Sequence, residues 1–163
     1  SAILSFRDEY PDLVGDDLKD QALKMASNCL MFDEFIMREV QKGKINQSQF
    51  SDTKQHIRLH GHCHQKALSS IGPTKEMLSL PANYSVDEIK SGCCGMAGSF
   101  GYEAEHYEVS MKVGELVLLP EVRKTPEHTI ISAPGTSCRH QIKDGTSRIA
   151  LHPIEVLYNA LLK

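Results

Sequence analysis

The first third of the chain carries apolar residues at helical spacing. Leu18, Ala22 and Met25 recur at intervals close to one helical turn, and the same periodicity continues through the apolar residues that follow. We therefore predict a helix over residues 16–42. Residues 43–54 are polar and rich in turn-forming side chains, which predicts a loop or linker.

From about residue 55 onward, short apolar runs alternate with helical patterns. The segments expected to be strands are HIRLHGHCH (56–64), VDEIKSG (86–92), HTIISAPG (128–135) and RIALHP (148–153). The segments expected to be helices are 73–80, 103–119, 138–144 and 154–162. This alternation predicts an α/β fold, a layered, Rossmann-like and mostly parallel sheet flanked by helices.

The composition is that of a globular protein and argues against nucleic-acid-binding and membrane-spanning proteins. The chain has 163 residues, of which 40% are hydrophobic and 24% charged, as is ordinary for one compact globular domain. The net charge is −3 and no basic cluster could cover a face, which argues against a nucleic-acid partner. No apolar run approaches the roughly 20 residues of a membrane span, and no secretory signal is visible. We expect a cytoplasmic protein with no membrane span.

Five cysteines are the main chemical signal: Cys29, Cys63, Cys93, Cys94 and Cys138. An odd number in a chain of this size argues against a secreted disulfide framework. Cys63, Cys93 and Cys138 each follow a predicted strand, and functional loops of parallel sheets lie at the carboxyl ends of strands. We therefore expect Cys63, the Cys93–Cys94 pair and Cys138 at one edge of the sheet. Thiolates favour iron–sulfur clusters and zinc, so these four cysteines predict a metal site.

Glycines accompany the predicted ligands. Gly95, Gly98 and Gly101 follow the cysteine pair where we expect a helix to begin, so that free N–H groups and the helix dipole would favour an anionic cluster. Gly135 lies close to Cys138. Because glycine lets the backbone approach an inorganic core, Gly95, Gly98 and Gly135 are the predicted cofactor-binding positions.

Other roles for these residues are weaker but stay open. Cys29 lies on an apolar helical face and fits a small core residue. Four histidines next to the cysteines could ligate metal, relay protons or simply form local hydrogen bonds: His60, His62, His64 and His140. A nucleophile made of Cys63 and a neighbouring histidine would not explain the adjacent cysteine pair. The glycine pattern lacks a phosphate-binding lysine, and no C-x₂-C of a zinc finger occurs.

At this point the sequence resembles a known family. CCG with a glycine-rich continuation, an upstream cysteine in HGHCHQKAL and a downstream one in APGTSCRHQI resemble the cysteine-rich CCG domain. That domain occurs in heterodisulfide reductase and in the iron–sulfur subunits of glycolate oxidase and anaerobic glycerol-3-phosphate dehydrogenase. The nearest resemblance is to the C-terminal end of fusion proteins that begin with an FAD-linked oxidase of the D-lactate dehydrogenase type.

The resemblance implies a ligand set. Cys63 matches the family's first cysteine, Cys93 and Cys94 match the pair, and Cys138 matches the last cysteine of a C-x-x-C motif. The first cysteine of that motif falls on Gly135, which is a departure from the pattern. Family members with the full set resemble binders of a non-cubane [4Fe–4S] cluster, and some relatives resemble zinc proteins. Four cysteines leave room for a conventional cluster, for zinc, or for a histidine that completes the site.

The resemblance also suggests two parts and a function. Residues 55–163 would be the CCG domain, and residues 1–54 the helical end of a preceding CCG-like repeat plus a linker, with Ala2 where Cys138 stands. The implied function is electron transfer within a flavin-dependent 2-hydroxyacid oxidoreductase. Its partners would be a flavin-containing domain or subunit and a carrier such as a quinone, and this chain would have no complete active site. The alternatives are a structural zinc module and a thiol enzyme.

Overall fold

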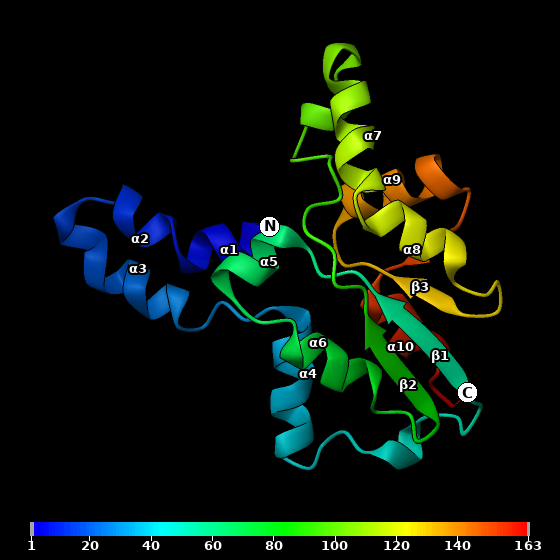
Figure 1. Cartoon of the computed structure of the whole chain (residues 1–163). Coiled ribbons are helices and arrows are strands. Elements are labelled where there is room, and N and C mark those ends of the chain that lie inside the picture. The colour runs from blue at the N-terminus through cyan, green and yellow to red at the C-terminus, as the bar shows by residue number, and fades with distance from the viewer. Residues whose placement is uncertain (1, 163) are drawn as a thin grey trace.

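A four-stranded parallel sheet forms the centre of the molecule. The computed structural model describes residues 2–162. The strands are β1 (Gln55–Leu59), β2 (Tyr84–Glu88), β3 (Ile130–Ser132) and β4 (Ala150–Leu151), in the spatial order β2-β1-β3-β4 with every pair parallel (Figure 1). The predicted α/β fold with its parallel sheet is confirmed.

Helices pack on both faces of this sheet. The helices of this part of the chain are α5 (Cys63–Leu68), α6 (Gly72–Leu78), α7 (Tyr107–Glu115), which projects away from the sheet (Figure 1), α8 (Leu118–Lys124), α9 (Thr136–Thr146) and α10 (Pro153–Asn159). Ile131 of β3 packs in one core with Leu118 of α8 and Ile142 of α9. On the opposite face, Ile57 of β1 packs in a second core with residues of α6 and α10. Side chains that alternate along a strand point to opposite faces, so a short β3 can join two cores.

The region predicted as one helix over residues 16–42 is broken. After a 3-10 turn, η1 (Asp16–Leu18), it contains α3 (Lys19–Ala26) and α4 (Phe32–Gln41). Asn28 ends α3 because its side chain donates a hydrogen bond to the Lys24 carbonyl at 2.8 Å, in place of a helical backbone bond. The apolar periodicity continues between α3 and α4, so it could not reveal that the Asn28 side chain competes with the helical backbone bond.

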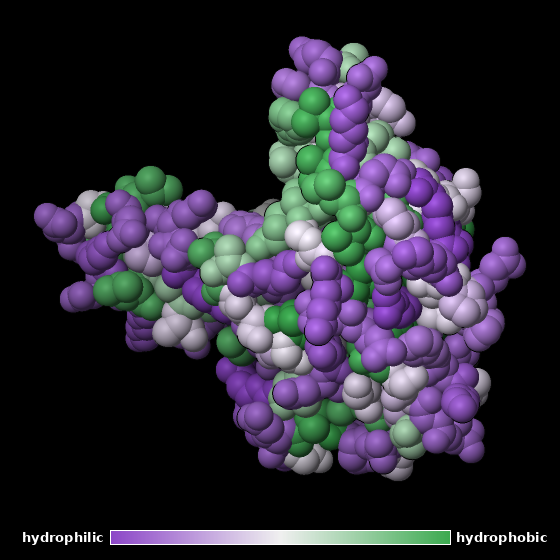
Figure 2. All heavy atoms as spheres, viewed as in Figure 1, coloured by the Kyte–Doolittle hydropathy of each residue, from purple (hydrophilic) through white to green (hydrophobic). Residues whose placement is uncertain are grey.

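An N-terminal arm extends away from the sheet (Figure 1). It consists of α1 (Ala2–Arg7), α2 (Tyr10–Leu13) and α3. Figure 2 shows apolar patches on the arm, and its exposed apolar side chains include Leu13, Leu18 and Leu23. The arm therefore contributes little to the core around the sheet.

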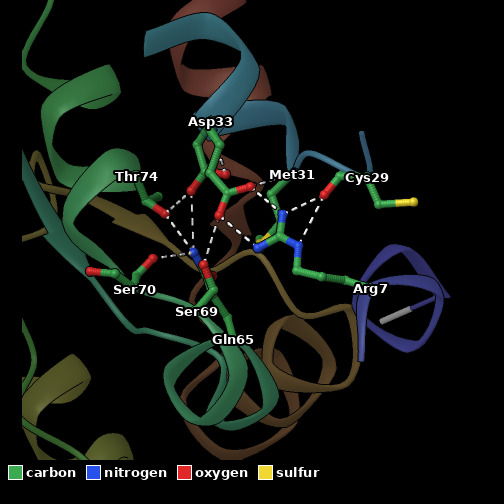
Figure 3. Close-up of polar contacts among 9 residues, drawn as sticks. Arg7, Cys29, Met31, Asp33, Gln65, Ser69, Ser70 and Thr74 are labelled. Carbon is green, nitrogen blue, oxygen red and sulfur yellow. Dashed lines mark hydrogen bonds and ion pairs between the residues drawn. The ribbon is translucent and has the colours of Figure 1, made fainter. Parts of the chain in front are cut away.

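Buried polar contacts attach α4 to the sheet domain (Figure 3). Asp33, near the start of α4, accepts hydrogen bonds from Thr74 of α6 and from the Gln65 amide of α5, the latter at 3.2 Å. A buried carboxylate is tolerated because these donors satisfy it. An isolated antiparallel bridge between Phe50 and Leu161 joins the linker, which contains the turn η2 (Gln47–Gln49), to the C-terminal end. Residues 2–54 and the sheet domain thus share buried contacts.

The helix predicted over residues 103–119 is also divided. Two 3-10 turns, η3 (Phe100–Tyr102) and η4 (Ala104–His106), precede α7, and a break near Val117 separates α7 from α8. After the break, α8 buries Leu118 and Val122 in the core with Ile131 of β3, while Leu119 is buried next to Gly114 of α7 and Gly145 of α9. No helix within residues 2–162 is long and apolar enough to cross a membrane.

Candidate metal centre

Three strand ends bring the four predicted ligands together. β2, β1 and β3 are parallel neighbours, so the segments that follow them leave the sheet side by side at one edge. A cavity of about 810 Å³ lies there, and its lining includes Cys63, Cys93, Cys94 and Cys138. All four cysteines thus line one cavity, although only Cys94 and Cys138 belong to the tight group of ligand atoms described next, and the role of the four as metal ligands stays a prediction.

A tight group of potential ligands lies at this cavity, of which Cys94 and Cys138 line the cavity and the fully buried His60 does not. The Nε2 or Nδ1 atom of His60 and the sulfurs of Cys94 and Cys138 all lie within 4.8 Å of one another. All three residues are buried, with His60 fully excluded from solvent. Within residues 2–162, no other three His, Cys, Asp or Glu side chains come this close together.

Cys94 has the properties of a ligating thiolate. A hydrogen bond from the Cys138 thiol lowers the pKa of Cys94 well below its usual value, and contact with His60 acts in the same direction against the effect of burial. The same interaction raises the pKa of Cys138, because only one of the two adjacent thiols ionises readily. A metal cation would remove this competition, since a coordinating thiol is deprotonated.

Cys63 and Cys93 form the shallower part of the site. Cys63 is exposed as the first residue of α5, and Cys93 is half-buried. The Gly95 N–H donates to the Cys93 sulfur at 3.3 Å, as expected for backbone support of a thiolate. Burial and the neighbouring Cys93 raise the pKa of Cys63. A raised pKa opposes the alternative in which Cys63 is an activated nucleophile.

The helix expected directly after the cysteine pair is wrong. Positive φ angles at Gly95 (102°), Ala97 (41°) and Gly98 (71°) prevent helix formation, and α7 begins only at Tyr107. A dipole from that helix therefore does not reach the pair. The longest helix that begins at the cavity is instead α9, and Cys138 lies in its first turn.

Gly95 has a packing role in addition to its N–H bond. A Cβ at this position would lie 2.1 Å from the carbonyl oxygen of Ser110 on α7. The structure thus explains the absence of a side chain by close contact with α7. Gly98 faces open space and lines the cavity. The cofactor-binding role of both glycines stays a prediction.

His62 occupies the space beside Gly135, the position at which the family pattern has a cysteine. A Cβ at Gly135 would lie 2.2 Å from His62 Cδ2 and 2.9 Å from the Cys138 sulfur. The ring of His62 therefore fills part of the volume that a cysteine side chain would need. Burial lowers the pKa of His62, which keeps the imidazole neutral and able to act as a ligand.

The remaining candidates lie outside the tight group. His64 lines the cavity, and the exposed His140 lies 2.7 Å from the Tyr102 hydroxyl. Cys29 lines a different hollow with Arg7 and Glu34. Sequence reasoning named His60 only among several histidines. His60 differs from the other histidines in its position, because it is the first residue after β1. Its N–H donates a hydrogen bond to the Ser132 carbonyl at 2.8 Å.

These residues fit a metal. The Nε2 atom of His60 is buried without a hydrogen-bond partner, and one ring nitrogen of this residue lies within 4.8 Å of the Cys94 and Cys138 sulfurs. Nitrogen and sulfur donors together suit zinc and iron–sulfur centres. The chemistry of the site therefore supports a metal centre held by cysteines, with histidine available.

Comparison with known proteins places the chain beside dehydrogenases. It is 27% identical over 158 residues to D-2-hydroxyglutarate dehydrogenase of Pantoea ananatis, which covers 96% of this chain and 14% of that protein. It is 26% identical over 157 residues to one of the subunits of anaerobic glycerol-3-phosphate dehydrogenase of Escherichia coli, covering 96% of this chain and 38% of that subunit.

A shorter match has higher identity. The D-2-hydroxyglutarate dehydrogenase of Pseudomonas putida is 33% identical over 103 residues, 62% of this chain and 10% of that protein. No family model matches the chain, and no solved structure gives a significant match. The chain thus spans about a seventh of the length of the Pantoea ananatis dehydrogenase and well under half of the glycerol-3-phosphate dehydrogenase subunit, and it is similar to one segment of each.

Proposed function

We propose that this chain is a metal-binding, electron-transfer domain of an FAD-linked 2-hydroxyacid oxidoreductase. The observation that carries the proposal is the convergence of Cys63, Cys93, Cys94 and Cys138 on one cavity at the carboxyl edge of the sheet. The named relatives support the oxidoreductase context, because two kinds of dehydrogenase contain a similar segment. Substrate oxidation would occur at a flavin in another domain or subunit.

A bound iron–sulfur centre would supply one-electron chemistry, passing electrons from the flavin toward a carrier such as a quinone. The protein's own contribution is to hold thiolates in a pocket that is closed on its sheet side. Cys94 and Cys138 are buried, whereas Cys63 is exposed. This gradient of exposure suits a centre that must exchange electrons with a partner while its inner ligands stay protected.

A structural zinc module that docks the flavin part is the second candidate. The group of one histidine and two cysteines within 4.8 Å favours it, since zinc commonly takes nitrogen and sulfur ligands in a tetrahedron. Zinc has no redox chemistry, so the two candidates differ in a measurable property.

The two-part organisation remains part of the proposal, with residues 1–54 as the end of a preceding CCG-like repeat. Both α4 and α10 begin with one capping contact in common, a glutamate that accepts a hydrogen bond from the N-cap N–H, although only His152 also accepts a bond with its side chain. Glu34 accepts a hydrogen bond from the Met31 N–H at 2.8 Å, and Glu155 accepts one from the His152 N–H at 2.7 Å. Both helices also pack against α6. Repeated capping and packing support a duplicated unit whose first copy has Ala2 at the place of a ligand.

Anaerobic reconstitution with ferrous iron and sulfide, compared with zinc loading, tests this function. We expect an iron–sulfur absorption band near 400 nm, reversible reduction, and loss of bound metal in Cys94→Ser. Cys29→Ser is the matched control, because Cys29 lies outside the cavity. A colourless protein that binds only zinc would support the docking module instead. Equal metal content in Cys94→Ser and wild type would contradict both.

A further inference from the structure

His60 is a fully buried histidine whose two ring nitrogens have different surroundings. Nδ1 lies 2.7 Å from the hydroxyl oxygen of Ser91, whereas Nε2 has no hydrogen-bond partner. A buried polar atom without a partner is costly, and most native structures avoid it. The position of His60 therefore calls for an explanation beyond packing.

Ser91 can fix which nitrogen of His60 carries the proton. Its hydroxyl can donate to the Ile89 carbonyl at 3.3 Å, which uses its only hydrogen. The same hydroxyl oxygen then accepts the Nδ1–H of His60. In that tautomer, Nε2 carries a free lone pair. Metal-bound histidines typically have this arrangement, with one nitrogen donating to a fixed acceptor and the other bound to the metal.

One ring nitrogen of His60 lies close to the two buried thiols of the cavity, and Nε2 is the nitrogen that Ser91 leaves free. The ligand atoms of His60, Cys94 and Cys138 lie within 4.8 Å of one another. In a tetrahedral site, metal–sulfur bonds of about 2.3 Å and metal–nitrogen bonds of about 2.0–2.1 Å place two ligand atoms about 3.6–3.8 Å apart, so a pair at the 4.8 Å limit would close by about 1 Å. The three atoms therefore need only small shifts to meet on a single metal atom.

We propose that His60 binds, through Nε2, the same metal atom as Cys94 and Cys138. This inference rests on the proposed function and specifies its ligands. It makes the inner part of the centre a mixed nitrogen–sulfur site, and it leaves Cys63 and Cys93 to complete the coordination from the cavity side. Ser91 is then a positioning residue that fixes the orientation of the imidazole.

Pulsed electron paramagnetic resonance tests the inference directly on the unmodified chain. The protein is loaded in separate samples with iron plus sulfide, followed by reduction, and with cobalt(II) in place of zinc. We expect a nitrogen hyperfine coupling that changes from ¹⁴N to ¹⁵N character when the protein is labelled with ¹⁵N-histidine. A loaded wild-type protein without this coupling overturns the role of His60 and leaves the proposed function intact. Failure to bind either metal overturns both.

Variants assign the coupling to one histidine. It should disappear in His60→Gln and persist in His62→Gln, whose ring also borders the cavity, and in His128→Gln, which is an exposed control. Ser91→Ala should retain the coupling but weaken metal binding about 10–100-fold, as second-sphere changes do. Persistence of the coupling in His60→Gln, or unchanged metal affinity in folded Ser91→Ala, contradicts the assignment of these roles.

Discussion

Replacing Gly95 by alanine should destabilise this chain much more than replacing Gly98 by alanine. Both glycines belong to the loop after the cysteine pair, and both have positive φ, 102° and 71° respectively. They differ in the space around them. A Cβ at Gly95 would lie 2.1 Å from the Ser110 carbonyl oxygen, whereas a Cβ at Gly98 meets nothing within 4 Å. The pair of variants therefore separates backbone strain from steric overlap.

The expected difference in stability between the two variants follows from backbone strain and steric overlap. A left-handed conformation costs an alanine about 1–2 kcal/mol at Gly98, and the larger φ of 102° at Gly95 costs at least as much. Gly95→Ala adds overlap with backbone that cannot rotate away, for which we take the upper end of the cost of overpacking, about 3 kcal/mol. For a chain of this size each kcal/mol lowers the melting temperature by about 2–4 °C. Gly95→Ala should therefore melt about 6–12 °C below Gly98→Ala.

Thermal unfolding of the metal-free proteins is the suitable measurement, because bound metal would add its own stabilisation. Metal uptake of the folded variants is then measured separately. Equal melting temperatures for the two variants would refute the steric reasoning. If Gly95→Ala is as stable as Gly98→Ala but binds less metal, the glycine serves the centre rather than the contact with α7.

Two further predictions concern other side chains. Gly135→Cys alone should lower the stability of the protein, because the new side chain would displace the His62 ring. Combining Gly135→Cys with His62→Ala should restore the stability and raise the amount of iron bound per protein, and a double variant no better than Gly135→Cys would contradict this. Burial raises the pKa of Glu34, but hydrogen bonds from Arg7, Ser69 and the Met31 N–H together outweigh this and hold that pKa at about 2, below the ordinary value of 4.5. The stabilisation is therefore complete above pH 4.5 and is lost as the pH falls toward about 2. Arg7→Met should cost about 1–2 kcal/mol at neutral pH and make that acid limb shallower in urea titrations, because only the Ser69 and Met31 hydrogen bonds would remain, whereas the exposed Lys19→Met should change neither.

The parallel sheet could be predicted because its signals are local. Each strand is a short apolar run bounded by turn residues, and alternation with helices leaves few arrangements for a chain of this length. The common placement of Cys63, Cys93 and Cys138 follows from the same rule, since parallel neighbours end at one edge. Neither inference required knowledge of side-chain packing.

The finer features depend on contacts between distant residues. The loop after Cys94 resembled a helix start in sequence, but its geometry depends on the close contact of Gly95 with Ser110. The distinction of His60 from His62 and His64 depends on Ser91, which is 31 residues away in the chain. Local periodicity contains no information on such pairs, so the sequence could identify the chemical types at the site but not their geometry.

The arm and α4 also contribute apolar residues to the wall of the cavity. Ile3 and Leu4 of α1 and Phe32 of α4 line the same cavity as the cysteines. They come from the segment that sequence reasoning separated from the cysteine-rich part. An apolar wall limits solvent access to a metal site and so influences its potential and the protonation of its ligands. The boundary near residue 55 therefore separates two sequence patterns, while the environment of the candidate metal centre is built from both sides of it.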